Sequence, residues 1–400
     1  MGRTMYYDLK RVVTLLDKYN LDLLVATTTE NIYYLSGYRS LSQRIMKGVP
    51  AAAVISRSGE SALVLPMAEL DIYALESWID VDHVRYYGEF YIEGAEKAES
   101  RTEYNLSKLL KKFEISKKFS EVLVEVIRNA CKTGCKSVGV DEMGIDVNTW
   151  NYIEKNLSEI SLRPAYNVFK EIRMVKTKHE IELLRKAAEI SQKAATVMLN
   201  SVKENMSEQE LSSIIEETVV KEGATPFTVL GCGRNSALPN AIPSTYRVKK
   251  GDIIRYDGGC EYKGYYSDIA MVASLGEASA RAKEYFKALA LGLEVALNEV
   301  RPGVKTSELF AKAVASVRRA GIPHYKRHHV GHGIGLECYD YPPITATCEI
   351  MLEPGMVINL ETPYYEIGFG GLQIEVTLVV TEKGYELLTP ETYIKELIII

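Results

Sequence analysis

Hydrophobic and polar positions along residues 1–165 follow the periods of both helices and strands. Apolar residues recur at helical spacing near residues 5–19, and the apolar runs LDLLVA, AAAVIS and SALVLP are typical of strands. The last two runs flank Ser58-Gly59, which predicts a hairpin. A strand in VDHVRYY, a long helix over about residues 105–130, a strand in SVGVDE and one more helix are expected to follow. This alternation predicts an α/β domain.

The rest of the chain, residues 166–400, contains a repeat. A long amphipathic helix that ends near residue 203 and a second one over about residues 279–300 are each followed by a shorter helix and by strands with glycine-rich turns. The positions that align at one constant offset are Glu210, Leu211 and Gly223 in the first copy and Glu308, Leu309 and Gly321 in the second. Two such copies predict an α+β domain whose halves face each other across a pseudo-two-fold axis, with a cleft between their sheets.

The composition fits a globular chain of two domains. Its 400 residues exceed the usual size of one hydrophobic core, and 46% are hydrophobic and 25% charged. A formal charge of −5 without a basic block argues against nucleic acid or an anionic membrane surface as a partner. No apolar run approaches the ~20 residues that span a bilayer, and the first residues lack a signal-peptide core.

The six cysteines do not predict a disulfide scaffold in a chain of this length. Cys131 and Cys135 lie close together in the sequence, without a second pair at zinc-site spacing, so we expect ordinary free thiols there. This use of cysteine favours a reducing cytoplasm as the location of the protein.

Acidic residues occur inside both hairpins of the repeat. Asp257 and Asp268 lie near facing positions in GDIIRYDGGCEYKGYYSDIAMVASLG, and Glu361 and Glu375 lie in MVINLETPYYEIGFGGLQIEVTLVV. A single acid in a strand usually faces solvent, but one pair in each repeat half predicts that four carboxylates meet in the cleft. Because four clustered carboxylates could not all stay ionised, we expect two divalent cations to balance them. Carboxylates with one imidazole suit Mn²⁺, Co²⁺, Fe²⁺ or Zn²⁺.

Three of the six histidines fall in the segment HHVGHGIGLE. His332 lies between two glycines, whose small size lets the backbone come close to a metal centre, so it is the candidate nitrogen ligand. His328 and His329 are candidate positioning groups beside it. His83, far away in the sequence, is expected at a strand edge without a functional role.

Together these motifs resemble those of the aminopeptidase P/prolidase/creatinase family, the pita-bread metallopeptidases. The motifs stand in chain order as YDGG with Asp257, YSD with Asp268, GHGIGLE with His332, INLE with Glu361 and LQIEV with Glu375. LDLLVATTTENIYYLSGY is similar to the start of the family's N-terminal domain, and EIRMVKTKHEIELLRKAAEI to the entry of its catalytic domain. The resemblance implies a creatinase-type N-terminal domain over residues 1–165 and a pita-bread catalytic domain over residues 166–400.

The resemblance also implies a role for each ligand. Asp257 would chelate one metal ion, and Asp268 and Glu375 would bridge the two ions. His332 and Glu361 would complete the shell of the other ion, with Glu361 near the attacking water. Members of the family tend to form homodimers, and we expect a homodimer here.

The chain departs from the family pattern outside the five ligands. Asn240 stands where a histidine ends the ALPH-type motif, and Tyr339 stands where a second histidine follows GHGIGLE. Ala270 replaces a hydroxyl residue that supports the metal site, and Gln373 replaces an arginine. Asparagine is no acid near neutral pH, and a tyrosine donates a hydrogen bond but shuttles protons poorly. Without the arginine clamp, substrate binding should depend little on a free carboxylate, and restoring all three substrate-handling residues should raise dipeptidase activity.

The sequence therefore favours a dinuclear metal-dependent hydrolase of small peptides, most simply an Xaa-Pro peptidase. Glu361 would take a proton from water, and Tyr339 with Asn240 would stabilise the tetrahedral intermediate. One alternative is a non-peptidase member of the family that acts on a small C–N or C–S compound. Another is a non-catalytic binding protein on the same scaffold, against which the retention of all five ligands argues. The departures from the family pattern are compatible with two alternatives. The metal scaffold carries out a different reaction, or the sequence has drifted and peptidase activity is retained.

Overall fold

The computed structural model describes residues 5–46, 48–94, 97–111, 117–132, 134–392 and 395–400. The chain divides into two compact units, Met1–Arg173 and Met174–Ile400. The division falls at the end of helix α8 (Tyr166–Met174), later than the boundary after residue 165 that the sequence suggests. Among the described residues, no helix is long and apolar enough to cross a membrane.

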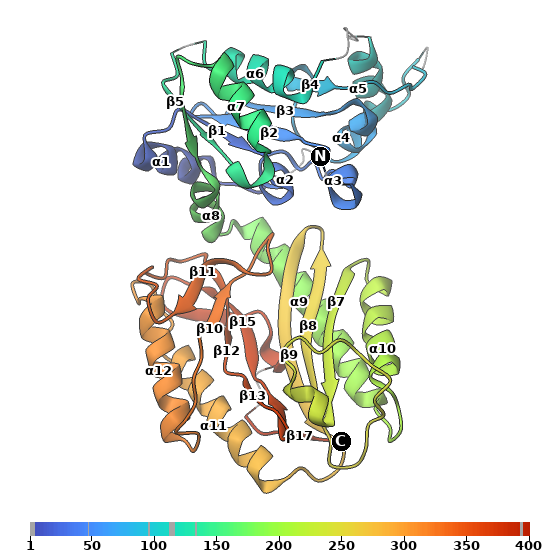
Figure 1. The fold of residues 1–400 in the computed structure, drawn as a ribbon, viewed down its shortest axis with the longest axis vertical. Helices are drawn as coiled ribbons and strands as arrows, with labels where there is room; N and C mark the ends of the chain where they lie inside the picture. The colour runs from blue at the N-terminus through green and yellow to red at the C-terminus, as the bar shows by residue number, and fades with distance from the viewer. Residues whose placement is uncertain (1–4, 47, 95–96, 112–116, 133, 393–394) are drawn as a thin grey trace. The chain divides into compact units, whose positions relative to one another are not determined.

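The first unit is built on a six-stranded mixed sheet (Figure 1). Its strands are β1 (Leu23–Ala26), β2 (Ala52–Ser56), β3 (Ser61–Pro66), β4 (Val84–Tyr87), β5 (Ser137–Val140) and β6 (Ser161–Pro164). Their spatial order is β4-β3-β2-β1-β5-β6, with β1 antiparallel to β2 and parallel to β5. The expected β2–β3 hairpin is present, and Gly59 takes a φ of +85° in its turn, a conformation that favours glycine.

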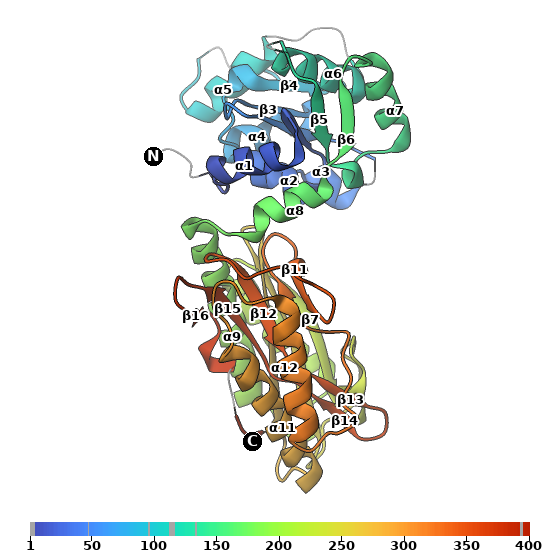
Figure 2. The ribbon, with the colours of Figure 1, turned by 90° about the vertical axis from the view of Figure 1, so that its left-hand side faces the viewer.

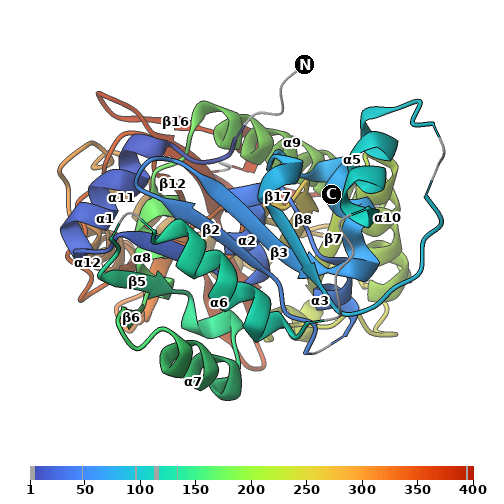
Figure 3. The same ribbon diagram turned by 90° about the horizontal axis from the view of Figure 1, so that it is seen from above.

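Helices cover both faces of this sheet. They are α1 (Leu9–Tyr19), α2 (Thr29–Ser36), α3 (Leu41–Ile45), α4 (Leu70–Glu76), α5 (Arg101–Leu110), α6 (Phe119–Ala130) and α7 (Val147–Asn156), with 3-10 turns η1 (Met67–Glu69), η2 (Val81–His83) and η3 (Glu142–Gly144). α6 and α7 lie on one face, where Leu123, Ile127 and Ile153 are buried against the strands (Figure 3). α2 packs against β1, β2 and β3. His83 lies in η2, directly before β4.

Two expectations for this unit are wrong. The single helix expected over residues 105–130 is two helices, α5 and α6, and residues 112–116 in the middle lie outside the described residues. The carboxylate of Glu121 accepts a hydrogen bond from the backbone N–H of Lys118 at 2.8 Å, which caps a new helix. Cys131 and Cys135 are not free thiols, because their sulfurs form a disulfide. Cysteine usage therefore gives no support to a reducing compartment.

The second unit contains the expected repeat (Figures 1 and 2). The first copy consists of α9 (Lys178–Ser201), α10 (Glu208–Lys221), β7 (Thr225–Cys232), β8 (Ile253–Tyr262) and β9 (Tyr265–Ser274). The second copy consists of α11 (Ala280–Leu297), α12 (Thr306–Arg319), β10 (His329–Gly333), β12 (Val357–Glu361) and β15 (Glu375–Val380). The remaining elements are η4 (Gly233–Ala237), β11 (Asp340–Thr345), β13 (Tyr364–Glu366), β14 (Gly370–Leu372), β16 (Tyr385–Leu387), η5 (Pro390–Thr392) and β17 (Ile398–Ile399).

Each copy contributes one sheet to this unit. The first sheet has the order β17-β9-β8-β7 and the second has the order β11-β10-β12-β15-β16. α9 and α10 pack on the first sheet, and α11 and α12 pack on the second, each pair over its own hydrophobic core. The two sheets meet where β9 lies against β15. The internal pseudo-two-fold repeat predicted from the sequence is therefore present, and it places the central strands of both copies around one pocket.

Candidate metal centre

The four acids predicted from the sequence line a pocket of about 280 Å³ in the second unit. Asp257 lies on β8, Asp268 on β9, Glu361 at the end of β12 and Glu375 at the start of β15. Glu361 and Glu375 are direct partners in the β12–β15 ladder, whereas Asp257 and Asp268 are offset from each other by two positions in the β8–β9 ladder. Two neighbouring strands of each sheet carry one acid each, β8 and β9 in the first sheet and β12 and β15 in the second. The four side chains therefore reach one pocket.

Burial and mutual repulsion change the ionisation of these acids. Burial raises the pKa of Asp268 and of Glu375 well above the usual range. The charges of neighbouring acids add to the shift, chiefly that of Asp257 for Asp268 and that of Asp268 for Glu375. Burial also raises the pKa of Asp257 to about 6, although the Arg255 guanidinium opposes the shift. Without cations, the four carboxyl groups cannot all be ionised in this pocket. The arrangement therefore suits positively charged ligands.

His332 completes this donor set. Its Nδ1 lies 2.9 Å from the carbonyl oxygen of Gly333, so Nδ1 carries the proton and Nε2 keeps its lone pair. Nε2 is buried, has no hydrogen-bond partner among the described residues and lies 3.8 Å from Oδ2 of Asp268. Ligand atoms of Asp268, His332 and Glu375 all lie within 4.8 Å of one another. An unsatisfied imidazole nitrogen beside crowded carboxylates fits a divalent metal ion.

Gly331 brings the His332 strand close to its neighbour. Gly331 has a φ of +145°, and a Cβ atom there would lie 2.0 Å from the carbonyl oxygen of Asn359. Gly331 pairs with Leu360 and His332 with Asn359. This close approach of the two strands sets the position of His332 along β12, near Glu361. The glycine before His332, noted in the sequence, thus has a steric role in forming the site.

Two residues that hold the acids were not identified from the sequence. Asn359 donates from Nδ2 to Oε1 of Glu375 at 2.9 Å and to the backbone oxygen of Asp268 at 3.0 Å. Cys338 donates from Sγ to Oδ2 of Asp268 at 3.3 Å. The signal for Asn359 was present, because it is a polar residue in the apolar strand VINLE. These contacts hold Asp268 and Glu375 in place, whereas Ala270, which is buried two residues after Asp268, offers no hydroxyl for such a contact.

The predicted substrate-handling residues lie around the same pocket, which is lined on this side by Pro239, Asn240, Arg327, His328, His329, Tyr339 and Tyr365. Nδ1 of His329 lies 3.1 Å from Oε1 of Glu361, and Nη2 of Arg327 lies 3.9 Å from the same oxygen. Burial alone would raise the pKa of Glu361, but His329 and Arg327 outweigh it and lower the pKa. Glu361 is therefore the acid of the four that keeps its charge most readily.

Tyr339, which ends the histidine cluster, stacks on His332. The two ring centroids are 3.8 Å apart with an interplanar angle of 20°, and Tyr339 remains 59% exposed. Partial burial and the nearby carboxylates raise its pKa above the usual value, so the phenol stays protonated and can only donate or accept hydrogen bonds. Partial burial, His329 and Arg327 lower the pKa of His328, which favours its neutral form.

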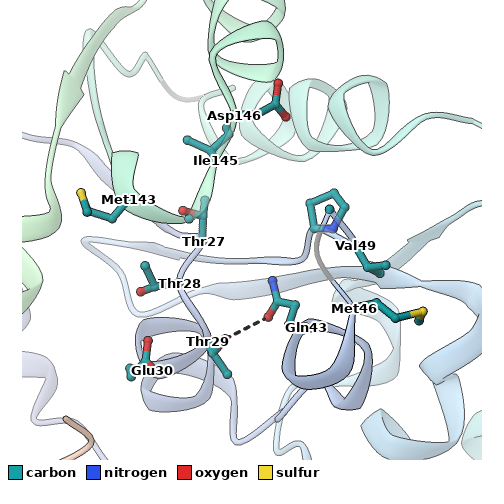
Figure 4. Close-up of a pocket in the computed structure, with 13 residues that line it drawn as sticks. Thr27, Thr28, Thr29, Glu30, Gln43, Met46, Val49, Met143, Ile145 and Asp146 are labelled. Carbon is teal, nitrogen blue, oxygen red and sulfur yellow. Dashed lines mark hydrogen bonds between the residues drawn. The ribbon is translucent and has the colours of Figure 1, made fainter. Parts of the chain in front are cut away.

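A larger pocket of about 490 Å³ lies in the first unit, beside the ends of β1 and β5 (Figure 4). Thr27, Thr28 and Thr29 form part of its wall, and Thr29 donates a hydrogen bond to Gln43 at 3.5 Å. Among the described residues that line it, the charged ones are Glu30 and Asp146, and Asp146 caps α7. Its described lining contains no histidine and no cluster of four carboxylates like that in the pocket of the second unit.

Comparison with known proteins assigns the family. The model of metallopeptidase family M24 matches residues 182–382, half of the chain, and the model of the creatinase/prolidase N-terminal domain matches residues 9–175. The chain is 28% identical to the Xaa-Pro dipeptidase of Pyrococcus horikoshii over 384 residues, which covers 95% of this chain and 96% of that protein. Its fold is similar to that of the prolidase from Pyrococcus horikoshii, with a TM-score of 0.77, 26% identity and coverage of 95% and 97%. It is equally similar to the X-Pro aminopeptidase from Thermotoga maritima, with a TM-score of 0.77, 25% identity and coverage of 98% and 99%. The chain therefore belongs to metallopeptidase family M24, as a metal-dependent hydrolase with a creatinase/prolidase N-terminal domain and a pita-bread catalytic domain.

Proposed function

We propose that this protein is an Xaa-Pro peptidase that works with two divalent metal ions. The observation that carries the proposal is the convergence of Asp257, Asp268, His332, Glu361 and Glu375 on one pocket, with an unsatisfied imidazole nitrogen among crowded carboxylates. Relatives that align over nearly the whole chain are named Xaa-Pro dipeptidases. The bond cleaved would be the one before proline in a small peptide.

The donor set supports two ions of the Mn²⁺, Co²⁺, Fe²⁺ or Zn²⁺ class. Asp268, His332 and Glu375 offer one compact group of ligand atoms, and Asp257 and Glu361 on the flanking strands would complete the shells. The four carboxylates carry four negative charges, which two divalent ions would balance. When bound, such ions polarise a carbonyl group and lower the pKa of water.

The chain's own side chains would then position the substrate and move the proton. Glu361 is held ionised by His329 and Arg327, so it can accept a proton from the attacking water. The Tyr339 phenol, fixed by its stack on His332, can donate a hydrogen bond to the oxygen that develops negative charge. Asn240, which also lines the pocket, can donate a second one, and neutral His328 would orient the substrate.

The rim also supports a second candidate, a non-peptidase hydrolase or lyase for a small C–N or C–S compound. Asn240 and Tyr339, two of the positions that differ from the peptidase pattern, both line the pocket and leave the five proposed ligands intact. An asparagine and a tyrosine in place of two histidines reduce the capacity for proton transfer to a leaving amine. A reaction other than peptide hydrolysis at the same metal centre would involve Asn240 and Tyr339.

A substrate screen on metal-loaded protein tests the proposal. The protein would be stripped with EDTA, reloaded separately with each of the four metals and assayed with Xaa-Pro dipeptides, Xaa-Pro-Yaa peptides and matched Xaa-Ala peptides. We expect cleavage only before proline and only with metal. Asp268→Asn should abolish turnover, whereas Glu382→Gln, at an exposed acid outside the pocket, should not. Metal binding without cleavage of any Xaa-Pro peptide would favour the second candidate.

We further propose a cytoplasmic homodimer. The resemblance to the family supports the dimer. Light scattering of the purified protein and fractionation of the source cells would test the two points separately.

A further inference from the structure

Arg255 is a charged residue at the centre of the second unit. It lies on β8 two residues before Asp257, so both side chains point to the same face of the strand. Its exposed fraction is 0%, and it is among the largest fully buried side chains of the described residues. Burying an arginine costs several kcal/mol unless each part of the guanidinium is paired. The pairing of Arg255 therefore indicates what the residue does.

All three guanidinium nitrogens of Arg255 donate hydrogen bonds. Nε donates to the backbone oxygen of Ser236 at 2.9 Å, and Nη2 donates to those of Leu238 at 2.6 Å and Pro239 at 3.2 Å. These carbonyls belong to the segment that leads to Asn240 at the pocket rim. Arg255 thus fixes this segment from inside the protein.

The remaining nitrogen, Nη1, faces the acids. It donates to Oδ2 of Asp257 at 2.8 Å and to Oε1 of Gln373 at 3.2 Å. A guanidinium accepts no hydrogen bond, so Gln373 must present its oxygen to Arg255 and its Nε2 to the other side. The hydroxyl of Tyr365 donates to the same oxygen at 3.1 Å.

The amide nitrogen of Gln373 in turn lies within hydrogen-bond distance of two proposed metal ligands. Its Nε2 lies 3.4 Å from Oε2 of Glu361 and 3.3 Å from Oε2 of Glu375. Arg255 therefore touches Asp257 directly and reaches Glu361 and Glu375 through Gln373. Three of the four acids are thus hydrogen-bonded to Arg255 or to its partner Gln373.

We propose that Arg255 is the positioning residue of this metal centre, and that the positive charge expected at position 373 has been transposed to position 255. Gln373 is then the hydrogen-bond acceptor that Arg255 requires, and Arg255 supplies the guanidinium that an arginine at position 373 would otherwise supply. This inference rests on the proposed function. It reverses the expectation that arginine at position 373 would improve the enzyme, because a second guanidinium would meet Arg255 where the oxygen of Gln373 now lies.

An exchange of the two residues tests the transposition. The variants are Arg255→Leu, Gln373→Arg, the double exchange Arg255→Leu/Gln373→Arg, and Arg255→Lys, with Arg234→Leu as a control at an exposed arginine. Each single change should lower kcat by about tenfold or more with a smaller change in KM, since ligand orientation and not substrate contact is disturbed. The double exchange should recover at least about tenfold over either single variant, because contacting residues are not additive. Arg255→Lys keeps the charge but loses the forked geometry, so it should fall between the parent and Arg255→Leu.

A readout independent of activity separates this inference from the proposed function. Mn²⁺ titration and the metal-dependent shift of the melting midpoint should weaken in both single variants and recover in the double exchange. This pattern would support the transposition even if the parent cleaves no Xaa-Pro peptide. An increase in kcat or Mn²⁺ affinity for Gln373→Arg alone would overturn the inference. Strictly multiplicative effects in the double exchange would overturn it as well, and Arg255 would then be a structural residue only.

Discussion

Glu361 faces Glu375 directly across the β12–β15 ladder, and the amide nitrogen of Gln373 lies within 3.4 Å of an oxygen of each. Like charges at facing positions of neighbouring strands destabilise a sheet. The two acids differ in pKa, because His329 and Arg327 lower that of Glu361 while burial and repulsion raise that of Glu375. Of the facing pair, Glu375 is therefore the acid that holds a proton more readily in the metal-free protein, and a bound cation would offset the repulsion between the two carboxylates.

This charge pattern predicts opposite pH dependences of stability with and without metal. The raised pKa values of Asp257, Asp268 and Glu375 contribute stability that is fully present below the unfolded value of about 4. For the metal-free protein this contribution is lost as the pH rises, through about 6 for Asp257 and through the raised pKa values of Asp268 and Glu375. Metal binding requires deprotonated ligands, so its stabilisation should increase over the same interval.

Melting curves in EDTA and in excess Mn²⁺ between about pH 5 and 8 would measure this difference. At a hundredfold excess over the dissociation constant, each independent site should add about 2.7 kcal/mol to the free energy of unfolding. Equal midpoints in EDTA and in all four metals at every pH would contradict the metal-centre assignment.

Glu361→Gln should separate proton transfer from metal binding. The amide keeps one oxygen ligand but cannot accept a proton, so turnover should fall by about 10² or more while Mn²⁺ titration still shows binding. Glu382→Gln, at an exposed acid outside the pocket, should behave like the parent. A metal-binding Glu361→Gln variant with parental turnover would assign the base to another residue.

Asn359→Leu should weaken metal binding without touching a metal. Its Nδ2 holds Oε1 of Glu375 and the backbone oxygen of Asp268, and loss of such a supporting contact typically costs about 10- to 100-fold in metal affinity. Asn359→Asp should be at least as harmful, because it adds a fifth carboxylate to the pocket. Isothermal titration with Mn²⁺ would compare both variants with Thr228→Val, a control on β7. Parental affinity in Asn359→Leu would show that Glu375 needs no support from Asn359.

The strands of the second unit and the acids that line its pocket were predictable because local patterns specify them. Acids inside apolar runs, the duplicated helix pair and the glycines around His332 are all visible along the chain. The break between α5 and α6 was missed because helical periodicity continues across it, whereas the Glu121 cap that starts α6 is a short-range contact. The Cys131–Cys135 disulfide was missed because sequence spacing alone did not distinguish it from two free thiols.

The residues that hold the four acids in place were not predictable because their partners come from distant strands. Arg255 and Gln373 are far apart in the sequence, and only the packing of β8 beside the second hairpin brings them to 3.2 Å. A signal existed at Arg255, a charge inside the apolar strand IIRYDGGCEY and on the same face as Asp257. In the sequence, position 373 shows only the loss of an arginine. The guanidinium of Arg255, which lies beside Gln373, becomes visible only when the strands are packed together.

Arg327 gives a last prediction, on substrate length. Its guanidinium lines the pocket, lies 5.8 Å from the ring centre of Tyr365 and is 3.9 Å from Oε1 of Glu361. Once cations balance the acids, this guanidinium is free to pair with a substrate carboxylate in forked geometry. The replacement of arginine by Gln373 predicted little dependence on a free carboxylate, but Arg327 predicts a clear preference for Xaa-Pro dipeptides over their C-terminal amides.

Kinetics on an Xaa-Pro dipeptide and its amide would decide between the two expectations. Arg327→Gln should raise KM for the dipeptide by about tenfold, the value of one charge-assisted contact, and leave KM for the amide nearly unchanged. Arg319→Gln, at an exposed position near the end of α12, should change neither value. If the parent does not distinguish the dipeptide from its amide, Arg327 acts on Glu361 alone, because a guanidinium that bound the substrate carboxylate would lose its partner in the amide. In that case Arg327→Gln should lower kcat for both substrates to the same extent, since Glu361 would lose one of the two groups that keep it ionised.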